Sequence, residues 1–250
     1  MNQFAAELRK LRTVPTTWVI TGIGLALVVL SALLPFLVPG FGGDFTGAAG
    51  QVASSVDTIG GNSIIVLIIG VLVVTTEFRH GTIGRTLQLV PSRTRVLAVK
   101  LAAGAAYAVA FVGVSLVLVA VILFAMAAVE NVSLSWGAEV WTALWQVFVG
   151  LGLTAMLGVA VGALLRSQVV AVTLVLVWVF VVENLAMLLP RVAQWLPFQA
   201  LNSVFLTAET RAQMPPGMRY LEPAAALATF LGYVAVLTTA AVVLMRERDV

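Results

Sequence analysis

Long uncharged runs of apolar residues divide the chain into six segments separated by short polar stretches. A helix that crosses the roughly 30 Å hydrocarbon core of a bilayer needs about 20 apolar residues. The second run, SIIVLIIGVLVVTT, is short and β-branched, but a helix satisfies every backbone group inside lipid, so a helix is predicted there too. The pattern therefore predicts an all-α polytopic membrane protein, a single transmembrane domain over 1–250, with spans at about 16–37, 58–76, 95–128, 140–165, 168–189 and 223–245.

Composition agrees with this pattern and excludes several classes of site. Hydrophobic residues make up 61% of the chain and charged residues 10%, whereas soluble domains average about 45–50% and about 25%. Without cysteine and with His80 as the single histidine, neither a thiolate nor a histidine metal cluster is expected. The run after residue 13 is too long for the core of a cleavable signal peptide, so none is predicted.

The positions of the basic residues predict how the chain crosses the membrane. Of the 14 Lys and Arg residues, all but Arg191, Arg211 and Arg219 fall on the side that carries both termini and the 77–100 segment. The positive-inside rule places that side in the cytoplasm. Because the net charge of +3 is small and the cations flank apolar spans, they indicate topology and no nucleic-acid partner.

The segment 77–100, EFRHGTIGRTLQLVPSRTRVLAVK, is the longest polar insertion between two spans. Gly81 allows a break, Thr82 is expected to cap a short helix over about 79–90, and Pro91 ends that helix. Ser92 is expected to cap the third span. Two interpretations stay open: a helix that docks on a soluble partner, or an interfacial turn held by lipid headgroups. Five basic residues lie in the segment, and the last three are expected at the depth of the lipid phosphates: Arg79, Arg85, Arg93, Arg95 and Lys100.

Residues 1–13 are predicted to form an amphipathic helix along the inner membrane surface. Phe4, Leu8 and Leu11 share one face, and Arg9 and Arg12 lie on the other. The alternative is a basic anchor that only sets topology.

Three further features lie within or after the later spans. Glu183, followed by Asn184, lies inside the fifth span, where an ionisable group is a functional candidate by default. It either fixes the geometry of an outer gate, paired with Arg191, Asn184 or a polar group of the following segment, or binds substrate or protons. Residues 190–222 are too apolar for a water-exposed loop and are expected to form short helices that dip back into the outer leaflet. Gly158 and Gly162 form a GxxxG that permits close helix packing, within the chain or across a dimer.

Several of these stretches together resemble the permease subunits of type-two ABC transporters, the class that includes drug and antibiotic exporters. EFRHGTIGRTL followed by VPSRTRVLAVKL is similar to the family's signature between its second and third spans. FAAELRKLRTVPTTW resembles its opening connecting helix, and GVAVGALLRSQ the close of its fourth span. WVFVVENLAMLLPRVAQWLPFQALNSV is similar to its fifth span and extracellular re-entrant segment.

The resemblance implies a half-transporter in a bacterial cytoplasmic membrane. A second permease subunit, the same or different, and a cytoplasmic ABC ATPase, in two copies, are the implied partners; ATP and Mg²⁺ would bind to that ATPase. The chain has no G-x-x-x-x-G-K-[ST] phosphate loop, so no cofactor or catalytic residue is expected in it. By carry-over, the ATPase-coupling interface comprises Glu77, Phe78, Arg79, His80, Gly81, Thr82 and Arg85. Glu77 is expected to anchor this loop to a basic group of the connecting helix such as Arg9 or Arg12.

The expected function is therefore the membrane-spanning subunit of an ATP-driven exporter of a hydrophobic or amphipathic compound such as a drug, an antibiotic or a lipid-like molecule. An intramembrane enzyme is the first alternative, although Glu183 is the one acidic group within the predicted spans and no histidine accompanies it. A nontransporting membrane scaffold or sensor is the second.

Overall fold

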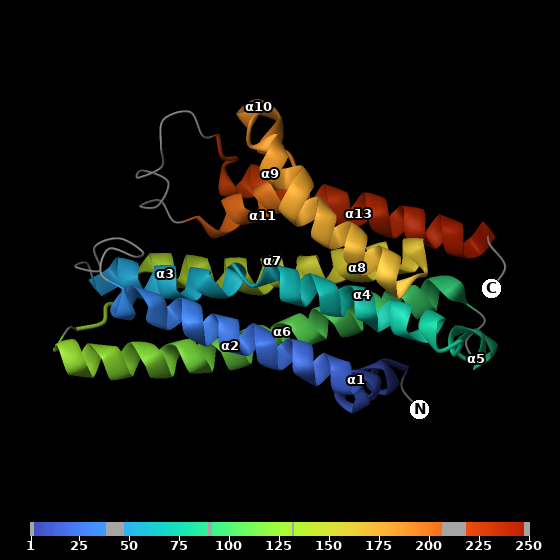
Figure 1. Cartoon of the computed structure of the whole chain (residues 1–250), viewed down its shortest axis with the longest axis horizontal. Coiled ribbons are helices and arrows are strands. Elements are labelled where there is room, and N and C mark those ends of the chain that lie inside the picture. Colours follow the sequence, from blue (N-terminus) through green and yellow to red (C-terminus); the bar gives the residue numbers. More distant parts are fainter. Residues whose placement is uncertain (1–2, 39–47, 90–91, 132, 207–218, 248–250) are drawn as a thin grey trace.

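The apolar runs fold into a bundle of long helices in the computed structural model of the chain, which describes residues 3–38, 48–89, 92–131, 133–206 and 219–247 (Figure 1). No strand occurs among these residues. In chain order the helices are α1 (Gln3–Thr13), α2 (Pro15–Leu37), α3 (Ala48–Gly60), α4 (Ser63–Arg79), α5 (Ile83–Leu89), α6 (Arg93–Glu130), α7 (Ala138–Leu165), α8 (Gln168–Val177), the π-helical turn η1 (Trp178–Val182), α9 (Glu183–Ala186), α10 (Pro190–Ala193), α11 (Pro197–Phe205) and α13 (Pro223–Glu247).

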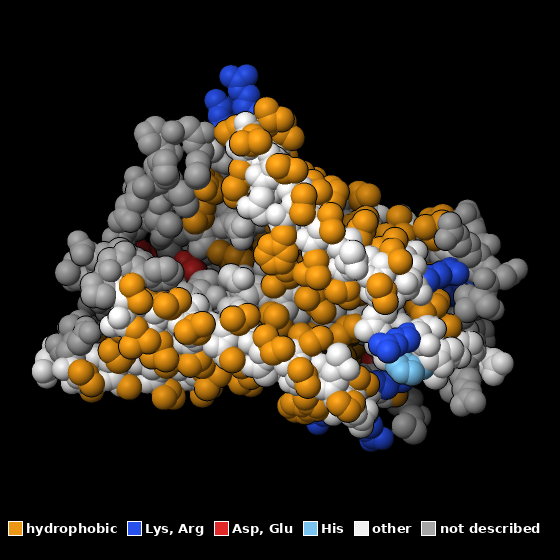
Figure 2. All heavy atoms as spheres, in the orientation of Figure 1, with side chains coloured by type: hydrophobic (Ala, Val, Ile, Leu, Met, Phe, Trp, Pro, Cys, Tyr) orange, Lys and Arg blue, Asp and Glu red, His pale blue; other side chains and the backbone are white. Residues whose placement is uncertain are grey.

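Within the described residues, six helical stretches are long and apolar enough to cross a membrane. This confirms the prediction of a multi-pass, all-helical membrane protein. Figure 2 shows hydrophobic side chains over much of the visible face, with Lys and Arg side chains near the end that carries α5 and at the tip formed by α10. The stretches are Pro15–Leu37, Val52–Arg79, Arg93–Val129, Ala138–Leu165, Gln168–Ala186 and Pro223–Met245.

Two predicted boundaries differ from the structure. The second span, predicted at 58–76, is extended by α3, because only the turn at Gly61 and Asn62 separates α3 from α4. Polar groups near the end of α3 are paired locally: the Thr58 hydroxyl donates to the Ser55 carbonyl (2.7 Å), and Asn62 Nδ2, just after the helix, donates to the Thr58 carbonyl (3.1 Å). The first span ends at the predicted residue 37, with Pro35 inside the last turn of α2. The fifth span ends at Ala186 instead of residue 189.

Two spans form the centre of the bundle and four surround them. In the stretches that contain α4 and α7, 78% and 61% of the residues in the most apolar window are buried, against 17–28% in the other four. Gly70 of α4 and Gly158 of α7 lie directly against the facing helix, where a Cβ on either would overlap a backbone carbonyl oxygen. The GxxxG pair therefore serves packing within the chain, as one of its two interpretations predicted.

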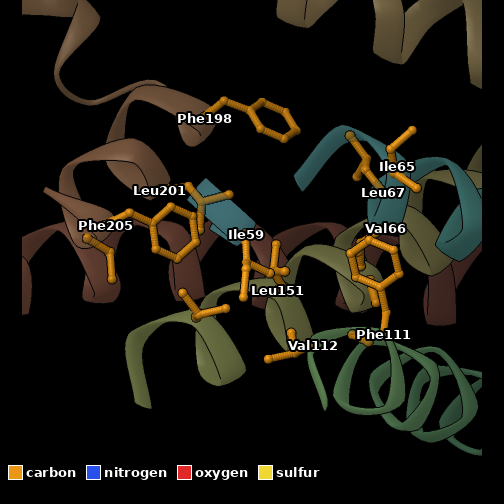
Figure 3. Packing of buried hydrophobic residues seen from close by; sticks show 14 of the residues in the cluster. Ile59, Ile65, Val66, Leu67, Phe111, Val112, Leu151, Phe198, Leu201 and Phe205 are labelled. Carbon is orange, nitrogen blue, oxygen red and sulfur yellow. The ribbon is translucent and has the colours of Figure 1, made fainter. Parts of the chain in front are cut away.

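The short helix α11 packs into the core through its aromatic residues (Figure 3). Phe198, Leu201 and Phe205 are all buried. A Cβ on Gly60 of α3 or on Gly150 of α7 would lie 2.7 Å from the Phe205 ring, so these glycines provide the space for it. Residues 197–205 are thus no solvent-exposed loop, as predicted, whereas the preceding Trp195 is exposed. Residues 207–218 of the same predicted segment lie outside the described residues.

Candidate functional site

Four charged side chains from three helices meet at the end of the bundle that carries α5. Glu7 and Lys10 come from α1, Glu77 from the last turn of α4, and Lys100 from the second turn of α6. Lys10 Nζ lies 2.8 Å from Glu7 Oε1 and 2.5 Å from Glu77 Oε1. Lys100 Nζ lies 3.0 Å from Glu7 Oε2 and 2.9 Å from Glu77 Oε1. Each cation contacts both carboxylates, so these four residues form one neutral ion cluster.

Burial distinguishes the two cations of this cluster. Lys100 is 1% exposed, and its ammonium also donates to the Val73 carbonyl (3.3 Å). Removing such a charge from water is costly unless ion pairs and hydrogen bonds compensate, which these contacts do. Lys10 is half-exposed. Burial alone would lower the pKa of Lys10, but the hydrogen bonds and charges of Glu7 and Glu77 outweigh it and raise that pKa above its usual value.

The partners of Glu77 correct two predictions. An anchor between Glu77 and the N-terminal helix was predicted, but through Arg9 or Arg12; both arginines are exposed, and Lys10 is the partner. The reason is helical spacing: Glu7 and Lys10, three residues apart, share the face of α1 that contacts the bundle. Lys100 was expected at the depth of the lipid phosphates, but seven residues into α6 it is buried in the ion cluster.

Glu77 also connects the ion cluster to α5. Gly81 adopts a left-handed conformation (φ 65°), which ends α4 and turns the chain. The Thr82 N–H donates to the Glu77 carbonyl (2.9 Å), and the Thr86 hydroxyl donates to Glu77 Oε2 (3.4 Å). The short helix therefore begins at Ile83, later than the predicted residue 79. The Thr82 hydroxyl donates to the Glu77 carbonyl (3.5 Å).

The remaining candidates of this segment are distributed around the same end of the bundle. The guanidinium of Arg166 lies over the aromatic ring of Phe78, with Cζ 5.7 Å from the ring centre. Arg79 Nη1 donates to Gln168 Oε1 (3.4 Å), and His80 Nδ1 lies 2.8 Å from the Thr76 carbonyl. Arg79, His80, Gly81 and Thr82 are exposed. The side chain of Arg85 lies outside the described residues, although its backbone belongs to α5.

Arginines that flank the spans join the end of α13 to the same region. Arg93 Nη1 donates to the Met245 carbonyl (2.6 Å), and Arg166 Nη2 donates to the Leu244 carbonyl (3.2 Å). The Ser92 hydroxyl accepts from the Arg95 N–H (3.4 Å), which confirms Ser92 as the cap of α6. The first turn of α6 and the ends of α7 and α13 thus meet beside α5, and α1 lies at this end too (Figure 1).

Glu183 occupies a second polar site, near the other end of the fifth span. The side chain is 2% exposed. Its Oε1 accepts from the backbone N–H of Phe198 (2.8 Å) and from Trp178 Nε1 (3.2 Å). Because Phe198 lies in the first turn of α11, Glu183 caps that helix and fixes it to the span before it. Of the partners predicted for Glu183, the polar group of the following segment is the one observed.

The π-helical turn η1 immediately precedes Glu183. A π turn displaces the residues that follow it and leaves carbonyls without their usual partners. Asn184, an exposed residue, donates from Nδ2 to the Phe180 carbonyl (3.0 Å) and the Val179 carbonyl (3.3 Å). The two adjacent polar residues therefore have different roles: Glu183 holds α11, and Asn184 satisfies the backbone of η1.

We expect Glu183→Ala to release α11 from the fifth span. The buried N–H of Phe198 would lose its acceptor, at a cost of about 1–3 kcal/mol. Limited proteolysis of the purified protein would then cut within 190–222 faster than in the wild type, while Asn184→Ala, on the exposed side of the same turn, would change this little. Equal cleavage of the two variants would contradict the capping role.

In the part of the chain that the structure describes, no three His, Cys, Asp or Glu side chains are grouped so as to hold a metal ion. The contacts among charged residues at the α5 end are ion pairs and hydrogen bonds that join helices, so the arrangement is suited to transmitting movement between them. No protein-family model matches the sequence. Comparison with curated proteins likewise gives no match.

Proposed function

We propose that the chain is the permease subunit of an ATP-driven exporter, coupled through α5 to a separate cytoplasmic ATPase. The observation that carries this proposal is the ion cluster, which joins the turn between α4 and α5 to α1 and α6. An energy-transducing membrane subunit needs a contact surface outside the bilayer and a stiff connection from that surface to its spans. A short helix next to a buried set of ion pairs meets both needs.

The contacts define how a displacement of α5 reaches the spans. Thr86 connects α5 to the Glu77 carboxylate, and Glu77 contacts Lys10 of α1 and Lys100 of α6. Glu77 lies in the last turn of α4, and α4 packs against α7 in the centre of the bundle. A push on α5 would therefore move α1, α4 and α6 together.

The remaining parts of the proposal follow from the same assignment. The α5 end lies in the cytoplasm of a bacterial cell, since most Lys and Arg residues flank it. The segment with α10 and α11 dips back into the outer leaflet, with Glu183 fixing its position. Two permease subunits enclose the path of a hydrophobic or amphipathic substrate, and ATP with Mg²⁺ binds to the partner ATPase.

Copurification tests this function directly. An affinity-tagged chain extracted from its native membranes in mild detergent is expected to bring down an ATPase subunit, identified by mass spectrometry, and ATP hydrolysis. In the double variant on α5, Arg85→Glu reverses a positive charge and Gln88→Glu adds a negative one. This variant is expected to reduce the amount of recovered ATPase at least tenfold.

Arg191→Glu is the matched control, because it reverses an exposed charge on α10, away from α5. This variant is expected to retain the ATPase. Wild-type protein that brings down no ATPase, or an α5 variant that retains it fully, would overturn the proposal.

A further inference from the structure

A large cavity opens beside the ion cluster. Its volume is about 1070 Å³, above the range of most small-ligand sites. It lies between α1, the first turn of α2, the last turns of α4, the start of α5 and the first turns of α6, with Gln168 of α8 at its border. Much of the wall is aliphatic: Leu11, Val14, Leu72, Val73, Val96 and Val99.

The charges around this cavity do not balance. Glu7, Lys10 and Glu77 contribute to the wall, and with the buried Lys100 they form the neutral ion cluster. Arg79 also lines the cavity, and its hydrogen-bond partner is the uncharged Gln168 amide. Among the described side chains that line the cavity, the guanidinium of Arg79 is thus a positive charge beyond those of the neutral ion cluster.

Further donors are available next to this charge. An ammonium has three N–H groups, and Lys10 uses two of them on Glu7 and Glu77. The imidazole of His80 donates from Nδ1 to the Thr76 carbonyl, so its Nε2 is an acceptor in the neutral ring and a second donor only when the ring is protonated. Both residues line the cavity with Arg79. A polar, cationic rim therefore adjoins an aliphatic wall, and this combination is complementary to a molecule with an anionic headgroup and a hydrocarbon chain.

We propose that this cavity binds an acidic amphiphile, with its phosphate or carboxylate headgroup on Arg79 and its hydrocarbon chain along the aliphatic wall. Arg79 supplies a planar pair of N–H donors, which suits a phosphate. The ligand is either an acidic phospholipid of the surrounding leaflet or an acidic compound that the protein moves. This site depends only on the chain's own residues and holds whether or not α5 binds an ATPase.

Binding is measured on the purified full-length chain in an uncharged detergent. The probe is dioctanoyl phosphatidic acid, compared with dioctanoyl phosphatidylcholine and inorganic phosphate, by native mass spectrometry over a concentration series. We expect saturable binding of one phosphatidic acid per chain, with weaker binding of phosphatidylcholine, which has no net charge, and of phosphate, which has no hydrocarbon chain.

Variants test each half of the site. Arg79→Gln is expected to weaken phosphatidic acid binding roughly tenfold, and Arg79→Lys to restore part of it. Ala6→Trp, which fills the cavity from α1, is expected to weaken it as well. Arg95→Gln is the control, since Arg95 is an exposed arginine of α6 that does not line the cavity. Arg79 is exposed, so its variants are expected to fold.

Lipid analysis of the same preparations distinguishes the two sources of ligand. A resident phospholipid would copurify with the wild type and be depleted in Arg79→Gln. A moved compound would leave the purified site free of acidic lipid and open to the added probe. Equal affinity for phosphatidic acid and phosphatidylcholine, or unchanged binding in Arg79→Gln, would overturn the inference.

Discussion

Gly158→Leu is expected to prevent the two central helices from packing and to leave little folded protein. A Cβ at position 158 would overlap the carbonyl oxygen of Leu67 and would lie 3.0 Å from the amide nitrogen of Val71. Both are backbone atoms of α4, so no rotamer change relieves the clash, and the helices must separate. Overpacking of this kind costs about 3 kcal/mol or more, a large share of the stability of a typical domain.

Gly152→Leu is the matched control for this substitution. Gly152 lies on the same helix, and a Cβ there would meet nothing within 4 Å. The two variants add the same side chain at the same helix-propensity change, so they differ only in the space available. Monodisperse yield after detergent extraction and the thermal unfolding midpoint are the measurements. If Gly158→Leu matched Gly152→Leu in both, the close approach of α4 and α7 would be refuted.

The six spans were predictable because the bilayer imposes a strong constraint on sequence. A membrane helix must carry about 20 residues with few charges, and this length signal does not depend on tertiary contacts. The fourth span, predicted at 140–165 and observed in α7 (Ala138–Leu165), shows how well it works. The signal fails where polar residues are buried by protein, as in α3, whose Ser, Asp and Thr residues are too polar for a typical span.

The ion cluster was only partly predictable. Glu77 was identified as the residue that anchors the N-terminal helix, but its partner on that helix was chosen by charge alone. Two signals pointed to the correct partners: Glu7 and Lys10 are spaced to share one face of a helix, and Lys100 lies about two turns beyond the Ser92 cap. Which cations are buried together depends on how α1, α4 and α6 meet, and hydropathy carries no information on that.

The second polar site shows the same limit. The sequence identified Glu183 as unusual because a charge inside a span is costly, and it named a polar group of the next segment among the possible partners. It did not predict the π-helical turn η1. The sequence therefore shows that Glu183 needs a hydrogen-bond partner, but it does not show that the backbone N–H of Phe198 is that partner.

Lys100→Met is expected to destabilise the protein by about 3–5 kcal/mol, because it leaves Glu7 and Glu77 buried with Lys10 as their single cation. Methionine keeps much of the volume of the lysine side chain, so the loss is electrostatic. Lys10→Met removes a cation from the same cluster, but Lys10 is half-exposed. Water then compensates part of the loss, and a smaller effect of about 1 kcal/mol is expected.

A double substitution separates charge balance from packing in this cluster. Lys100→Met combined with Glu7→Gln removes one charge of each sign and leaves Lys10 paired with Glu77. We expect this variant to be more stable than Lys100→Met alone, with a coupling energy of about 1–3 kcal/mol between the two positions. Thermal unfolding of the four proteins in nanodiscs measures that coupling. Additive effects would show that the four charges do not act as one cluster, and α5 would then lack the connection to α1 and α6 on which the proposed transmission depends.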